Sequence, residues 1–296
     1  MIYDRAMPEI PTCLPPVRAT RRSQLEVPPG AVDCHTHVFD SRYPLSPDRG
    51  YNPPDSTLDD MLAMHAQLGI ERVVFTQPSV YGTDNSAILD AMSLIPDRAR
   101  AVVALTADVT DDELVRLDSL GVRGIRLNLD NVGGMPLEMD DIPAMAARIH
   151  ELGWHVEFLF AGDDLPDLLD LFHQLHAPIS IGHFAYMDAR EGVESDNFRA
   201  LLDLVSQGNT WIKLSGPNRL KVGDLPPWPE VVPLAHALID VAPDRMLWAT
   251  DWPHPNKYEV QPNDADLIEQ LELWAPDPHM RKRILVDNPE TLYRFA

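Results

Sequence analysis

The feature that most restricts the fold of this sequence is an eightfold alternation of short apolar runs with longer amphipathic segments. The apolar runs span residues 31–35, 72–77, 101–105, 124–128, 155–160, 179–183, 211–215 and 246–250. The amphipathic segments have helical spacing and span residues 57–68, 84–95, 111–120, 140–152, 165–176, 195–207, 230–241 and 264–274. Alternating strands and helices form parallel βαβ units, and eight such units close a barrel. We therefore predict an α/β fold, a single-domain (β/α)8 TIM barrel over residues 31–296, with an irregular N-terminal arm over residues 1–30.

Turn and cap residues agree with this alternation. A capping-box pattern over residues 57–60 opens one helical segment, and Gly69, Gly121 and Gly153 follow three segments where a left-handed residue ends a helix. A doubly wound open sheet is the alternative fold, but it ordinarily has fewer strands, and no Gly-x-Gly-x-x-Gly follows the first run. The proline-rich connection over residues 39–55 follows the first strand, so we expect it to lie over the barrel mouth.

Composition excludes several classes of partner. The 24 Lys and Arg residues face 46 Asp and Glu residues, which gives a formal net charge of −22. Such a charge repels phosphate backbones and anionic lipid, so we expect neither nucleic acid nor a membrane surface as a partner. Cys13 and Cys34 cannot build a disulfide framework, and the N-terminal residues contain no apolar core of signal-peptide length. These features predict a soluble, cytoplasmic protein.

Polar side chains gather at the ends of the predicted strands, where (β/α)8 enzymes carry their reactive groups. His35 and His37 end the first strand on one face, because successive side chains of a strand alternate between faces. Arg126, His183 and Asp251 end or follow the fourth, sixth and eighth strands. Taken singly, each has a structural alternative: a strand-end histidine is often a hydrogen-bonded core residue, and Arg126 could pair with Asp251 across the mouth. Their convergence on one end of one barrel indicates an active site.

Several motifs support this view and suggest a family. They are VDCHTHVF (32–39), QPSVYGTDN (77–85), GVRGIRLN (121–128), IGH (181–183), KLSGPNRL (213–220), ATDWPHPN (249–256) and NPETLY (288–293). In this order they resemble the amidohydrolase superfamily, and within it the branch that contains 2-pyrone-4,6-dicarboxylate lactonase and related lactone hydrolases. The resemblance covers residues 30 to 296.

The resemblance implies a role for each matching residue. Asp251 is expected to deprotonate the water that attacks the lactone, while His35, His37 and His183 surround the carbonyl and stabilise the oxyanion. The implied substrate-binding residues are Arg126, Arg219, Ser79, Tyr51, Asn128 and His254. These roles agree with general chemistry, because preplaced donors stabilise charge that develops on a carbonyl oxygen, and arginine binds carboxylates through two parallel hydrogen bonds.

Two departures from the family bear on substrate and cofactor. The dicarboxylate lactonase has a further arginine shortly after the fourth-strand motif, where this chain reads Asp130-Asn131. The fifth strand offers His155 at the wrong end for a metal ligand, with phenylalanines at the mouth. We therefore expect catalysis without a metal. The alternative is a single Zn²⁺ held by His35, His37, His183 and Asp251.

The predicted function is hydrolysis of the ester bond of a small acidic lactone, such as a 2-pyrone-4,6-dicarboxylate-like, sulfomuconolactone-like or sugar-acid lactone. Two alternatives keep the fold but change the chemistry: a sugar-acid lactone isomerase and a decarboxylase of the same superfamily. A third is a barrel that binds a metabolite without catalysis, although such a protein has no need of a base at position 251. A homodimer with contacts between the outer helices of the barrel is a further expectation.

Overall fold

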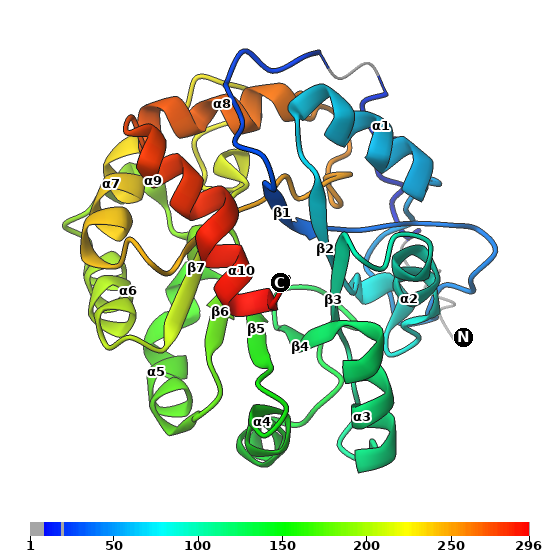
Figure 1. The fold of residues 1–296 in the computed structure, drawn as a ribbon. Coiled ribbons are helices and arrows are strands. Elements are labelled where there is room, and N and C mark those ends of the chain that lie inside the picture. Colours follow the sequence, from blue (N-terminus) through cyan, green and yellow to red (C-terminus); the bar gives the residue numbers. More distant parts are fainter. Residues whose placement is uncertain (1–8, 19–20, 296) are drawn as a thin grey trace, which may run out of the picture.

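The computed structural model describes residues 9–18 and 21–295, and it contains the predicted (β/α)8 barrel (Figure 1). Eight parallel strands follow one another in sequence order. They are β1 (Val32–Thr36), β2 (Arg72–Thr76), β3 (Ala99–Val103), β4 (Val122–Asn128), β5 (His155–Leu159), β6 (Ile179–Ile181), β7 (Thr210–Leu214) and β8 (Met246–Trp248). A parallel bridge between Thr36 and Trp252 joins the chain after β8 to the end of β1. The prediction of a (β/α)8 barrel is confirmed, and the site residues on the strand ends lie at one opening. The irregular arm over residues 1–30 stays a prediction, since residues 1–8 and 19–20 lie outside the described residues.

The helices between the strands also match the predicted segments. They are α1 (Leu58–Leu68), α2 (Ser86–Ser93), α3 (Asp111–Leu120), α4 (Ile142–His150), α5 (Leu165–Gln174), α6 (Asp196–Ser206), α7 (Val231–Val241) and α8 (Asp264–Trp274). Thr57 and Asp60 form the expected reciprocal capping box of α1. Gly69 ends that helix with a φ of 80°, a left-handed conformation that glycine adopts without steric cost.

The C-terminal segment forms three short helical elements that the sequence analysis did not predict. They are α9 (Pro278–Lys282), the π-helix η7 (Arg283–Asp287) and α10 (Asn288–Tyr293). Figure 1 shows α10 in front of one end of the barrel. Tyr293 is fully buried, and its ring lies 5.3 Å from the ring of His155, which begins β5. Because strands begin at the end opposite the mouth, this contact places His155 at the far end of the barrel, away from the residues at the mouth.

Two site residues lie beyond the strands on which they were predicted. β6 ends at Ile181, and His183 begins the short helical turn η4 (His183–Tyr186), whose four residues have φ values of 49–54°. β8 ends at Trp248, and Asp251 has a φ of 63°. Such left-handed conformations cost of order 1–3 kcal/mol each outside glycine and cluster at functional sites. The backbone here bends to bring these side chains over the barrel axis.

Part of the N-terminal arm lies at the mouth, beside the loop over residues 39–55. The backbone N–H of Cys13 donates to the Asn52 carbonyl at 2.9 Å, and that of Leu14 donates to the Lys257 carbonyl at 2.8 Å. Cys13 and Cys34 are both buried and free. Among the described residues, no helix is long and apolar enough to cross a membrane.

Candidate active site

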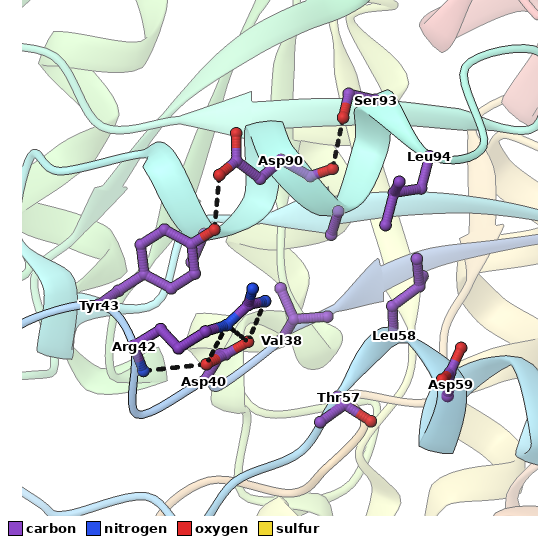
Figure 2. Close-up of a pocket in the computed structure, with 12 residues that line it drawn as sticks. Val38, Asp40, Arg42, Tyr43, Thr57, Leu58, Asp59, Asp90, Ser93 and Leu94 are labelled. Atoms are coloured by element: carbon purple, nitrogen blue, oxygen red, sulfur yellow. Dashed lines mark hydrogen bonds and ion pairs between the residues drawn. The ribbon is translucent and has the colours of Figure 1, made fainter.

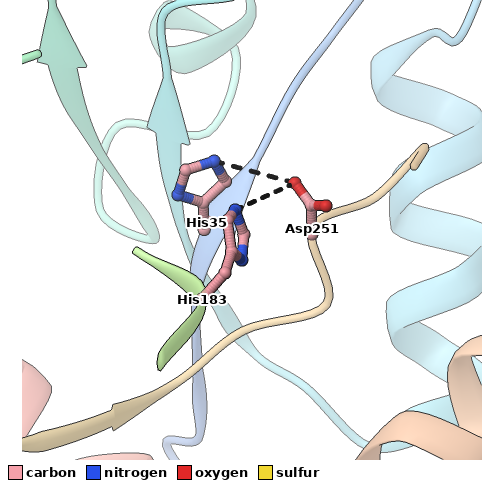
Figure 3. A group of neighbouring side chains, drawn as sticks. All are labelled: His35, His183 and Asp251. Carbon is pink, nitrogen blue, oxygen red and sulfur yellow. Dashed lines mark ion pairs between the residues drawn. The ribbon is translucent and has the colours of Figure 1, made fainter. Parts of the chain in front are cut away.

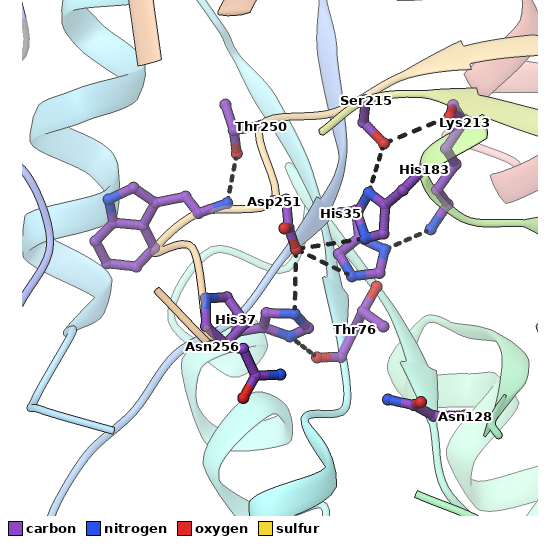
Figure 4. A network of polar contacts seen from close by, with 12 residues as sticks. His35, His37, Thr76, Asn128, His183, Lys213, Ser215, Thr250, Asp251 and Asn256 are labelled. Atoms are coloured by element: carbon purple, nitrogen blue, oxygen red, sulfur yellow. Dashed lines mark hydrogen bonds and ion pairs between the residues drawn. The ribbon is translucent and has the colours of Figure 1, made fainter. Parts of the chain in front are cut away.

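The carboxylate of Asp251 lies at the centre of the predicted histidine cluster (Figures 3 and 4). Its Oδ1 is 3.5 Å from Nε2 of His183 and 3.8 Å from Nε2 of both His35 and His37. Its Oδ2 accepts a hydrogen bond of 2.6 Å from Nε of Arg219 and lies 2.5 Å from Nη2 of the same guanidinium. All four cluster residues are nearly fully buried. The structure thus brings the four predicted catalytic residues together.

Backbone and side-chain hydrogen bonds fix the two chain segments that carry this cluster. The N–H of Asp251 donates to the His35 carbonyl at 3.0 Å. Asp33 is fully buried on β1 and accepts a hydrogen bond of 3.0 Å from the N–H of Thr250, while His65 of α1 contacts its other oxygen at 3.1 Å. Asp33 therefore joins β1, which carries His35, to the segment that carries Asp251. This role of Asp33 was not predicted from the sequence.

The electrostatics of the cluster favour neutral imidazoles around an ionised carboxylate. Burial, reinforced by the Arg126 charge, lowers the pKa of His37 to about 3. Burial lowers the pKa of His183 to about 4, even though Asp251 acts to raise it. Burial raises the pKa of Asp251, but the charge of the adjacent Arg219 guanidinium lowers it by more, so the pKa lies well below its usual range. At neutral pH this aspartate is a carboxylate.

A buried ion pair lies on the other side of His35. Lys213 of β7 and Glu157 of β5 form a short ion pair, and both side chains are almost completely excluded from solvent. The Lys213 ammonium lies 3.1 Å from Nδ1 of His35, and Glu157 Oε1 lies 3.3 Å from the same nitrogen. The sequence analysis overlooked Glu157. Two features could have indicated a site role for Glu157. It is a glutamate inside an otherwise apolar strand, and it pairs across the sheet with Arg126 of β4.

The predicted substrate-binding residues, with one exception, line a small cavity above Asp251. The cavity wall includes Tyr51, Ser79, Arg126, Asn128, Asn131, Tyr186, Arg219 and Asn256. Nη1 of Arg126 donates to the Gln77 carbonyl at 2.7 Å, while its Nε has no hydrogen-bond partner among the described residues. The ion-pair partner of Asp251 is Arg219, so pairing between Arg126 and Asp251 is not what the structure shows. Nε of Arg126 instead lies 4.0 Å from Oε1 of the buried Glu157, and the rest of the guanidinium borders the cavity.

His254 is the exception. Its side chain is buried, and its Nε2 lies 3.0 Å from Oδ1 of Asp264 at the start of α8. It does not line the cavity. The turn after β8 places Asp251 toward the barrel axis and His254, at a φ of 65°, toward the outer helix. The structure thus gives His254 a contact that holds this turn against α8.

The mouth above the cavity is closed in this conformation. Nδ2 of Asn256 donates a hydrogen bond of 2.8 Å to Oδ1 of Asn131, which joins the loops after β8 and β4. The cavity beneath has a volume of about 20 Å³. A cavity of this size holds about one water. This cavity adjoins a wider hollow of about 470 Å³, and the two share Tyr186, Arg219 and Asn256.

A larger hollow of about 500 Å³ lies elsewhere, between α1, α2 and the loop after β1 (Figure 2). Its polar groups are engaged with one another: Arg42 pairs with Asp40, and the Tyr43 hydroxyl donates to Asp90 at 2.6 Å. None of the residues of the Asp251 cluster lines it. Size alone therefore does not mark the reactive site of this molecule.

Comparison with known proteins agrees with this geometry. Residues 32–295 match the protein family described as Amidohydrolase. A 4-sulfomuconolactone hydrolase of Hydrogenophaga intermedia is 37% identical over 98% of this chain and 97% of its own length. A 2-pyrone-4,6-dicarboxylate hydrolase of Comamonas testosteroni is 36% identical over 92% of both chains. A D-galactarolactone isomerase of Agrobacterium fabrum is 30% identical over 91% of this chain and 92% of its own.

Proposed function

We propose that this chain, which belongs to the amidohydrolase family, is an enzyme that hydrolyses the ester bond of a small acidic lactone. The observation that carries the proposal is the Asp251 carboxylate, held ionised among three neutral imidazoles at the base of a cavity that also contains Arg126. The names of the two hydrolase relatives support this reaction class. The candidate substrates are sulfomuconolactone-like, 2-pyrone-4,6-dicarboxylate-like and sugar-acid lactones.

In the proposed reaction Asp251 takes a proton from a water molecule as the water oxygen attacks the lactone carbonyl carbon. The carbonyl oxygen gains negative charge, and an N–H donor of the histidine cluster stabilises it. The ring C–O bond then breaks, and the proton held on Asp251 passes to the departing ring oxygen. The product is an open-chain acid whose former ring oxygen is now a hydroxyl, which is an enol that tautomerises to a ketone where that oxygen was attached to a C=C carbon, and Asp251 returns to its carboxylate form.

The substrate acid group is proposed to bind at Arg126 and Arg219, with Ser79, Tyr51 and Asn128 as neutral contacts. Local cations are needed because the chain as a whole carries a charge of −22. Asp130 stands where the dicarboxylate lactonase has its further arginine. We therefore propose a lactone whose second acidic group is absent or differently placed from that of 2-pyrone-4,6-dicarboxylate.

The donor groups of this site do not fit the metal ion that many amidohydrolases use. His35, His183 and Asp251 offer ligand atoms within 4.8 Å of one another, and His37 is outside that group. Two cations already contact two of these ligands, however: Arg219 binds Asp251, and the Lys213 ammonium contacts His35. A divalent ion would meet both positive charges at close range. We propose catalysis without a metal, and no step above uses one.

The test is a panel of acidic lactones followed by proton release at constant pH. Hydrolysis releases one proton for each ring opened, isomerisation between lactones releases none, and decarboxylation evolves CO2. Proton release with formation of the open-chain acid supports the proposal. Rearrangement without proton release would instead assign the chain to the reaction named for its isomerase relative. Tight binding without turnover would favour the non-catalytic alternative. A cytoplasmic location and a homodimer stay predictions.

A further inference from the structure

The Nδ1 atoms of the three site imidazoles have different hydrogen-bond partners. The partner of Nδ1 bears on which of the two ring nitrogens carries the proton. A neutral imidazole carries one proton, so the nitrogen that accepts a hydrogen bond leaves the proton on the other. Nδ1 of His37 lies 2.7 Å from the Thr76 carbonyl oxygen, which can only accept. His37 therefore carries its proton on Nδ1 and presents a lone pair on Nε2 to Asp251.

The partner of His183 is compatible with either proton position. Its Nδ1 lies 2.8 Å from Oγ of Ser215, a hydroxyl that can donate or accept. The other contact of this hydroxyl, with the Lys213 carbonyl, is 3.4 Å long and does not determine where the hydroxyl proton lies.

His35 has a different environment (Figure 4). Its Nδ1 lies 3.1 Å from the Lys213 ammonium, a group with three donors and no acceptor. Oε1 of Glu157, which can only accept, lies 3.3 Å from the same nitrogen, so the ammonium and the carboxylate favour opposite proton positions. The ammonium is the nearer group and favours the proton on Nε2, the atom that points toward Oδ1 of Asp251. That Nε2 is buried and has no hydrogen-bond partner among the described residues. A buried donor without a partner is costly to maintain and marks a place for an acceptor.

We propose that Lys213 is a positioning residue that holds the proton of His35 on Nε2, which makes His35 the hydrogen-bond donor to the lactone carbonyl oxygen. This inference rests on the proposed lactone hydrolysis. Glu157 holds the ammonium in place through its buried ion pair. The two histidines of one strand then have different roles: His35 donates to the developing oxyanion, while the lone pair on His37 accepts a hydrogen bond from the attacking water.

Glu157 also explains why the lysine is needed. Its Oε1 lies 3.3 Å from Nδ1 of His35, so without the ammonium this carboxylate becomes the nearest partner of that nitrogen. An acceptor at that position draws the proton to Nδ1 and leaves a lone pair on Nε2. Loss of the donor at position 213 therefore reverses the proton position of His35, and it also converts His35 into a nitrogen ligand able to bind zinc.

The direct test uses the wild-type protein and no substrate. Nitrogen-15 NMR of histidine-labelled protein at neutral pH distinguishes the two neutral imidazole forms by their nitrogen–proton correlations, and His35→Asn and His37→Asn variants assign the signals. We expect His35 with its proton on Nε2 and His37 with its proton on Nδ1. Finding His35 with its proton on Nδ1 would overturn the proposal, whatever the protein does to lactones.

A matched pair of variants tests the consequence for catalysis. Lys213→Gln and Lys213→Met remove the same charge, but only glutamine keeps an N–H donor for Nδ1 of His35. We expect Lys213→Met to lower kcat by about 10²- to 10³-fold, the usual loss for one oxyanion donor, with little change in KM. Lys213→Gln should retain clearly more activity, and only Lys213→Met should gain zinc affinity by calorimetry. Equal losses in both variants would show that the charge and not the donor matters, and would refute the proposal.

Two further outcomes keep the two proposals separate. If the variants do not fold because Glu157 is left unpaired, the wild-type NMR measurement still decides the proton position. If the wild-type protein hydrolyses no lactone in the panel, the proposed function fails. The proton position of His35 remains a measurable property of the structure in that case, so each idea can be rejected without the other.

Discussion

Replacement of Arg219 by methionine tests how the site keeps its base ionised. Arg219 makes two contacts with Oδ2 of Asp251, at 2.6 Å from Nε and 2.5 Å from Nη2, and both groups are buried. Two unit charges about 4 Å apart interact by about 4 kcal/mol at an effective dielectric constant of 20. Since about 1.4 kcal/mol corresponds to one pKa unit, removing the guanidinium should raise the pKa of Asp251 by about 3 units.

The sign follows from linkage. The guanidinium favours the charged carboxylate, so its removal favours the protonated form, and the acidic limb of the kcat/KM profile moves to higher pH. The contribution of this ion pair to stability is present above the pKa of an unfolded aspartate and is lost as the pH falls through the folded pKa. Arg219→Met should therefore lose less stability on acidification than the wild-type protein does.

The assay is hydrolysis of an acidic lactone across the pH range, with unfolding measured at matched pH. Arg126→Met is the matched control, because it removes an arginine of the same cavity that does not bind the Asp251 carboxylate. Its acidic limb should move much less. An acidic limb that stays in place in Arg219→Met would show that Arg219 does not control the ionisation of the base, and the electrostatic account of the site would be wrong.

Three other outcomes are expected. Asp251→Asn keeps the shape of the side chain but removes the proton acceptor, so turnover should fall by about 10²–10⁴-fold while an inert lactone analogue still binds; near wild-type turnover would remove Asp251 from the mechanism. Arg126→Met should raise KM severely and leave the thermal unfolding midpoint unchanged, and a collapse of stability would mean a structural arginine. Protein dialysed against a chelator should retain its activity, whereas loss restored by zinc would overturn metal-free catalysis.

Much of the architecture could be predicted from local pattern. The repeated change between strand and helix periodicity predicts the barrel, because each period determines which face of a segment is apolar and can be buried. The same reasoning places His35, His37 and Arg126 at one opening, since the ends of parallel strands meet there. The ends of α1 could also be predicted from local sequence. The first N–H groups of a helix need a nearby acceptor such as Thr57, and a left-handed terminal residue favours a glycine such as Gly69.

Contacts between distant segments could not be predicted in this way. The direction of His254 depends on a turn of three residues and on Asp264 ten positions later, and a motif does not distinguish an inward from an outward histidine in such a turn. The choice of Arg219 over Arg126 as the partner of Asp251 depends on the reach of two side chains across the mouth. These are matters of distance in space.

The sequence by itself determined which residue types stand at the barrel mouth, because strand alternation and strand order follow from hydrophobic period. Only the tertiary structure decided which hydrogen-bond partners those residues have, and therefore which ring nitrogen of His35 and of His37 carries the proton. Lys213 and Glu157 are 56 positions apart, and neither carries a local signal for the other, yet their ion pair beneath His35 determines the partner of its Nδ1. Hydrogen-bond direction depends on which donor and acceptor meet in space, and that is settled only when β1, β5 and β7 pack around one axis.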